Sequence, residues 1–367
     1  MKKIFLLLTI IMFSLTVCVY SDGISDFWNE KTKKEVEKSF DLINSEYDAV
    51  EIIDKLINGD FNIKYDNIYD YLKEKIKNSV YSGLSFYLKL FVVIMIASFI
   101  EILQTDTFIK NTSKILCTAM IVISISDVFY NISSYATEII DKLVIFINSL
   151  LPVMMSLLAF SGKSITVGAI SPLMSGISSV VSIFLKSFVL PLSFIGLALR
   201  LTDTITQRKV LSELGKQIFT IIKWILGLIM TAYISLISVI GASAPKVDNI
   251  TIKSAKFAVG NFIPYVGGIL SDSVDLMFTC SGVIKNSVGI AGLIGILSII
   301  AVPLIKIFTN GMIINLISAL TSPIADKEIS NAFSSVADSI NIIIAVMAVI
   351  SFMYILSVSV IIFIGST

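Results

Sequence analysis

Long apolar runs dominate the chain after residue 83, with short polar interruptions between them. Full-length candidate spans lie at 84–102, 115–135, 139–160, 218–241 and 340–364. Further apolar stretches that contain proline or glycine lie at 165–199, 257–286 and 287–320. A helix needs about 20 apolar residues to cross a bilayer, so the pattern predicts an all-α polytopic membrane protein with about seven membrane segments.

The stretch 165–199 is too long for one span and too short for two. Pro172 and Pro191 interrupt it, and the basic stretch 200–216 follows. Basic loops favour the cytoplasmic side. We therefore predict a broken or re-entrant helical hairpin that enters and leaves the membrane on one side.

The N-terminus has a different pattern. Two lysines precede an apolar core from Ile4 to Val19, which predicts a signal peptide over residues 1–21, with an uncleaved first helix as the alternative. Residues 22–83 then form a predicted extracytoplasmic helical segment. Between Asp22 and Val80 it carries 14 acids and 9 lysines. Apolar residues spaced three and four apart, from Val36 to Leu56, predict an amphipathic helix that folds on itself or docks a partner.

An internal repeat is a further prediction for the membrane domain, residues 84–367. Pro152 and Pro191 are 39 residues apart, as are Pro264 and Pro303, and the surrounding sequences are alike. The repeat units are about 139–241 and 253–364, an organisation that is common among transporters. Chance among seven prolines is the alternative.

Composition narrows the chemistry. The chain is 55% hydrophobic and 15% charged, against about 25% charged in soluble domains. It has no histidine and only three cysteines, which removes the commonest general base and zinc ligand. The phosphate-loop, zinc-protease and serine-hydrolase motifs are absent from the sequence. We expect no metal, no cofactor, no nucleic-acid partner and no enzymatic activity.

Ionisable residues inside apolar segments are the candidates for a polar path or a subunit contact. Asp127 and Lys186 lie within predicted spans, where end-of-helix snorkelling or one ion pair is the alternative. Asp272 and Asp275 are three residues apart on a segment that continues to Lys285 and Asn286. An intramembrane aspartyl enzyme would need acids facing each other from separate spans, so these four residues predict a polar surface at a helix junction.

Prolines and glycines mark the expected breaks and contacts. Pro152, Pro172, Pro191, Pro264 and Pro303 are candidate helix breaks, which polar cavities tolerate. Gly289, Gly292 and Gly295 form a small-residue face, for which close helix packing is the ordinary explanation.

Two stretches carry a family resemblance. FIPYVGGILSDSVDLMFTCSGVIKNSVGIAGLIGIL (262–297) and LLPVMMSLLAFSGKS (150–164) resemble the stage III sporulation protein AE family of endospore-forming Firmicutes. The leader, the helical segment and the spans match that family in order, so the resemblance covers nearly the whole chain.

The resemblance implies a membrane subunit of the complex that joins mother cell and forespore and is needed for late forespore gene expression. It implies a multi-pass location in the mother-cell-derived outer forespore membrane, with the lipid bilayer and the other membrane subunits of the stage III complex as partners. It carries no catalytic residue. Whether the chain also forms a homo-oligomer is left open, and a stand-alone secondary transporter of a small solute is the alternative function.

Overall fold

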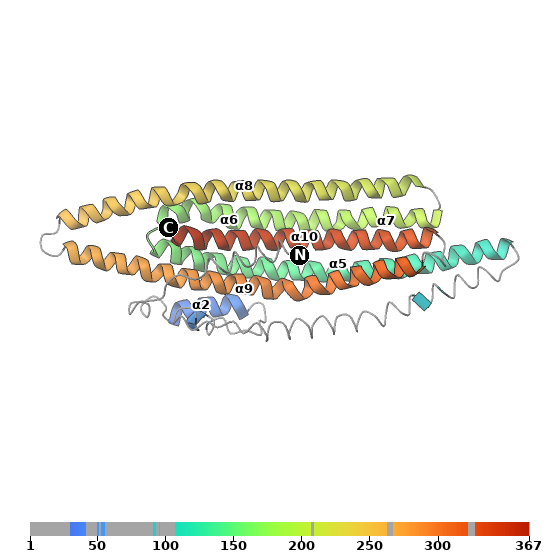
Figure 1. Cartoon of the computed structure of the whole chain (residues 1–367), viewed down its shortest axis with the longest axis horizontal. Coiled ribbons are helices and arrows are strands. Elements are labelled where there is room, and N and C mark those ends of the chain that lie inside the picture. The colour runs from blue at the N-terminus through green and yellow to red at the C-terminus, as the bar shows by residue number, and fades with distance from the viewer. Residues whose placement is uncertain are drawn as a thin grey trace.

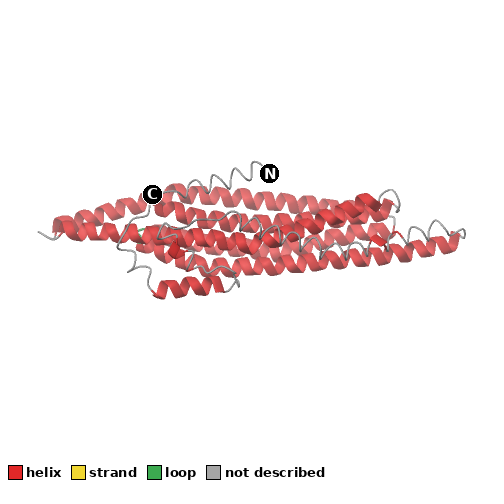
Figure 2. Cartoon of the chain, turned by 60° about the horizontal axis from the view of Figure 1, so that its bottom comes forward, coloured by secondary structure: helices red, strands yellow, loops and turns green. Residues whose placement is uncertain are grey.

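The protein is a bundle of long helices that lie side by side (Figures 1 and 2). The computed structural model describes residues 30–41, 50, 53–55, 91–92, 95, 107–206, 209–262, 267–321 and 327–366. Its elements are α2 (Glu30–Asp41), α5 (Thr107–Phe160), α6 (Ser164–Phe184), the π-helix η2 (Leu185–Val189), α7 (Leu190–Thr206), α8 (Lys209–Phe262), α9 (Gly267–Thr321) and α10 (Lys327–Ser366). The part of the chain that is described has no strand, and the predicted all-α class is confirmed there.

Five helices are long and apolar enough to cross a membrane. The qualifying segments are Thr118–Phe160, Thr166–Thr202, Val210–Val239, Gly282–Thr321 and Ile329–Ile364. Length and composition together indicate a membrane protein. The predicted signal peptide and nearly all of the predicted span 84–102 lie outside the described residues.

Three of the predicted interruptions are wrong, because the helices continue through them. The predicted spans 115–135 and 139–160 both belong to α5. The intervening residues 136–138 are Ala-Thr-Glu, and none of these breaks a helix. The predicted polar loop 242–256 lies inside α8, and the polar stretch 322–339 continues as α10 from Lys327.

The predicted re-entrant hairpin at 165–199 is also wrong. Figure 1 shows α6 and α7 in line, so the chain enters at one end of the bundle and leaves at the other. The π-helical turn explains how the rod passes Pro191: the N–H of Leu190 bonds to the carbonyl of Leu185, five residues back. Pro191 follows with no N–H to place, and a single π turn inserted in an α-helix absorbs the change in register.

The turn between α5 and α6 ends α5 where the sequence predicts. Gly162 has φ of 81°, a left-handed conformation that favours glycine. Its N–H bonds to the Ala159 carbonyl, and the Lys163 N–H bonds to the Leu158 carbonyl. These two bonds form a Schellman motif, which satisfies carbonyls that the helix end leaves unpaired.

The predicted internal repeat is matched at one turn and not at another. The repeat requires a shift of 112 residues, from Pro152 to Pro264. This shift moves the 207–208 connection to 319–320, next to the end of α9, but it moves the 161–163 turn to 273–275, inside α9. The repeat therefore stays a prediction.

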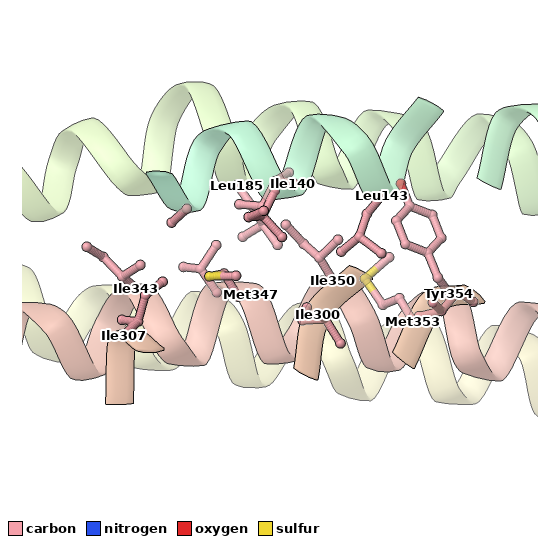
Figure 3. Packing of buried hydrophobic residues seen from close by; sticks show 14 of the residues in the cluster. Ile140, Leu143, Leu185, Ile300, Ile307, Ile343, Met347, Ile350, Met353 and Tyr354 are labelled. Carbon is pink, nitrogen blue, oxygen red and sulfur yellow. The ribbon is translucent and has the colours of Figure 1, made fainter. Parts of the chain in front are cut away.

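Helix α10 occupies the centre of the bundle and packs against α5, α7, α8 and α9. Figure 3 shows Ile343, Met347 and Ile350 of α10 among the buried side chains of its neighbours, including Ile140 of α5 and Ile307 of α9. These side chains are fully or almost fully buried. The described core is therefore apolar and continuous along the bundle.

Helices α7 and α8 approach each other most closely at two glycines. A Cβ atom on Gly215 would lie 2.6 Å from the carbonyl oxygen of Gly196 and 2.6 Å from Cγ of Arg200. A backbone oxygen cannot move aside as a side chain can. The contact therefore requires glycine at position 215.

We expect Gly215→Ala to destabilise the bundle by about 1–3 kcal/mol, because the added methyl group forces α7 and α8 apart. Gly227→Ala is the matched control on the same helix: its Cβ would have no neighbour within 4 Å, and alanine favours a helix over glycine by about 1 kcal/mol. Thermal unfolding of both purified variants measures the difference. Equal midpoints would contradict the close approach.

Candidate functional site

The described charged side chains of the bundle form contacts between helices, and these contacts are the candidate site. Lys186 lies in η2, and its Nζ is 2.5 and 2.7 Å from the two carboxylate oxygens of Asp141 on α5. Both side chains are partly exposed, at 33% and 46%. The pair therefore ties the π-helical turn to α5 at the edge of the core.

Asp127 does not take part in this pair. It is exposed on α5, on the same side as the exposed side chains of Ile123 and Tyr130. The sequence identified Lys186 but missed its partner. The signal depends on the α5–α6 turn: Asp141 lies 21 residues before Gly162 and Lys186 lies 24 after it, so antiparallel helices bring them level.

A second ion pair fixes the other end of α7. Nη1 of Arg200 donates to Oδ2 of Asp338 on α10 at 2.8 Å, and the guanidinium lies 5.2 Å from the ring centre of Phe219 on α8. Arg200 is 9% exposed. A guanidinium suits this site because it stacks on an aromatic face while it donates in its own plane. The sequence placed Arg200 in a polar connection and did not identify the pair.

Lys285 is fully buried, so it is not part of an exposed polar surface. Its Nζ donates to the carbonyl of Ile362 in the last turns of α10 at 3.1 Å. A cation stabilises the negative end of a helix, which accounts for the position. The neighbouring Asn286 has a buried Oδ1 that accepts no hydrogen bond from the described residues.

The pair that the sequence singled out lies farther along the same helix. Asp272 and Asp275 belong to the first turns of α9, and the helix continues without interruption to Lys285 and beyond. The predicted helix junction near Asn286 is therefore wrong: glycines alone did not interrupt the helix there. The side chains of Asp272 and Asp275 lie outside the described part of the structure.

A cluster of hydroxyl groups connects three helices inside the core. The hydroxyl of Tyr233 on α8 hydrogen bonds with Ser178 on α6 and with Ser357 on α10. Ser182 and Tyr354 form a second bond between α6 and α10 at 2.8 Å. Hydroxyl groups that bond across helices commonly hold membrane bundles together. Serine and tyrosine are frequent in this chain, and no spacing marked these four contacts.

The three glycines of α9 face other helices at close range. Cβ atoms there would lie 2.5 Å from Ile362 Cγ1 (Gly289), 2.4 Å from Leu150 Cδ2 (Gly292) and 2.6 Å from Phe146 Cζ (Gly295). Small residues let helices approach in this way. The glycines therefore set the distance of α9 from α5 and α10.

The candidate helix-breaking prolines lie mostly within continuous helices. Pro152 and Pro172 are exposed within α5 and α6, and Pro303 is buried within α9. Pro191 follows η2, and Pro264 lies outside the described residues. Among the described side chains, no group of three acids or cysteines converges where a metal ion could bind. What the arrangement provides is fixed helix packing.

We expect that reversing one charge of the Lys186–Asp141 pair destabilises the bundle, and that reversing both restores much of the loss. Lys186→Glu or Asp141→Lys alone places like charges together, whereas the double variant recreates an ion pair. The coupling should be roughly 0.2–1 kcal/mol, because the pair is partly exposed. Unfolding midpoints of the four proteins measure it. Reversal at the intrahelical pair Lys142–Glu138 on α5 is the control, and strictly additive effects at 186 and 141 would contradict the contact.

Comparison with known proteins places the chain in a family. The family model described as stage III sporulation protein AE matches residues 47–365. The curated stage III sporulation protein AE of Bacillus subtilis (strain 168) is 28% identical over 351 residues, which cover 94% of this chain and 86% of the relative. No solved structure shows significant similarity. Because the family model spans most of the sequence, the chain belongs to the stage III sporulation protein AE family.

Proposed function

We propose that this chain is a membrane subunit of the complex that connects mother cell and forespore across their intermembrane space during endospore formation. Its place would be the mother-cell-derived outer forespore membrane, and its partners would be the other membrane subunits of the stage III complex. The observation that supports this proposal is the family match over residues 47–365, which includes all five candidate spans.

The described contacts favour a scaffold within such a complex over a stand-alone transporter. A solute path needs polar groups that face a cavity. In the described bundle the core between the helices is apolar, and Asp141, Lys186 and Asp338 lie at its partly exposed edges. Rigid, closely packed helices suit a subunit that supports other components.

We expect affinity purification of the tagged full-length chain from sporulating cells to recover other stage III membrane subunits in fixed proportions. Cells that lack the chain should lose late forespore gene expression, measured with a reporter. A complex that assembles and functions normally without this chain would contradict the proposal. Uptake of a defined solute by the purified chain in proteoliposomes would favour the transporter instead.

Asp272 and Asp275 provide a second test. They occupy the same face of α9, in a hairpin whose end extends past the α5–α6 turn (Figure 1). We expect Asp272→Ala with Asp275→Ala to impair complex assembly or transport more than membrane insertion. Membrane fractionation measures insertion, and co-purification with sporulation counts measures the rest. Normal assembly and sporulation would exclude a contact role for the pair.

A further inference from the structure

The helices are too long for a single bilayer, so only part of each can lie in lipid. Helix α5 has 54 residues, which corresponds to a length of about 80 Å. A hydrocarbon core is about 30 Å thick. The distribution of charge along the sequence identifies which part of each helix is embedded.

Each long helix contains one stretch without charged residues. These stretches are 143–162, 164–185, 224–245, 286–305 and 339–367. Lysines bound the first four on both sides, and each has about the 20 residues of one span. Together we name them the charge-free band.

Contacts between helices show that these stretches lie at the same level. Gly292 of α9 meets Leu150 of α5, and Gly295 meets Phe146. Tyr233 of α8 bonds with Ser178 of α6 and with Ser357 of α10. Every one of these residues belongs to the charge-free band, and the Asp141–Lys186 pair lies just beyond one border. The band is therefore a continuous slab that matches the bilayer core in thickness.

One face of this slab suits lipid. The outer face of α8 within the band exposes Trp224, Leu228, Ile234 and Val239, and the exposed side chains of α6 include Val180 and Ile183. All are apolar. Figure 1 shows α8 along one edge of the bundle.

The opposite face does not suit lipid. There α2 packs on α5 and α9: Phe40 lies edge-on against Phe146, with ring centres 5.1 Å apart, and it is also next to Gly295. Val36, Phe40 and Ile53 are buried in this contact. Since Phe146 and Gly295 belong to the band, α2 is docked at bilayer depth.

The outer side of α2 is densely charged. Glu30, Lys34, Glu35, Glu37, Lys38 and Asp41 are exposed there. Lys33 bonds with Asp54 at 3.2 Å, which ties α2 to the following helical turn. A charged side chain in the bilayer centre costs more than burial of one apolar side chain returns, and here charged residues outnumber the buried apolar ones two to one.

From this conflict we propose that the α2 face of the bundle borders water, not lipid, through much of the thickness of the membrane. The charged side of α2 lines an aqueous recess, while α6 and α8 form the lipid face. A recess that opens to the extracytoplasmic side agrees with the predicted location of residues 22–83. The inference goes beyond the proposed function, because it concerns which face of this chain meets water.

Thiol reactivity tests the proposal, since a thiol in lipid does not ionise and does not react with maleimide. The full-length chain, with Cys18, Cys117 and Cys280 replaced by serine, receives a single cysteine by Glu37→Cys or Ile234→Cys. Membranes from sporulating cells are treated with N-ethylmaleimide, and the remaining thiols are counted after denaturation. We expect Glu37→Cys to react at least about tenfold faster than Ile234→Cys, which lies at similar depth on the lipid face.

A third variant verifies the docking of α2. With cysteines at positions 40 and 146, a short bifunctional thiol reagent should link α2 to α5. Slow labelling at position 37, fast labelling at position 234, or failure of the 40–146 link would each overturn the proposal. The readout is water access and not sporulation, so its outcome is independent of the test for complex membership.

Discussion

A backbone in hydrocarbon has no water to bond with, so each N–H and C=O must find its partner within its own helix. That constraint accounts for the shape of this bundle more than any single side chain does. It makes continuation of a helix preferable to interruption, which is why α5, α8 and α10 pass through positions that look like loops. The Schellman turn at Gly162 and the π turn before Pro191 are two local solutions to the same problem.

Once the backbone is satisfied, packing decides how the rods are arranged. Lipid tails are as apolar as leucine, so apolar contact alone gives little preference for one arrangement. Close approach at Gly196–Gly215 and along Gly289, Gly292 and Gly295 supplies shape, and the hydroxyl cluster around Tyr233 supplies direction. The two ion pairs, Lys186–Asp141 and Arg200–Asp338, then fix the ends of the η2–α7 segment against α5 and α10.

The N-terminal helix adds an asymmetry that the bundle alone lacks. Its apolar side completes the packing at Phe146 and Gly295, while its outer side stays charged. A membrane subunit with one apolar face and one charged face is suited to stand at the boundary between lipid and an aqueous space. This asymmetry fits membership in a multi-subunit assembly better than isolation in a bilayer.

The sequence by itself determined the helical class, the apolar segments, the end of α5 near Phe160 and the family, because apolar length and two long motifs are local properties. The buried face of α2 at Val36, Phe40 and Ile53 could also be predicted from spacing. The sequence did not determine where helices continue, since prolines and short polar stretches break a helix only when nothing else satisfies its backbone. It also could not pair Lys186 with Asp141 or bury Lys285 against Ile362, because those partners are distant in the chain and only the antiparallel packing of the helices brings them level.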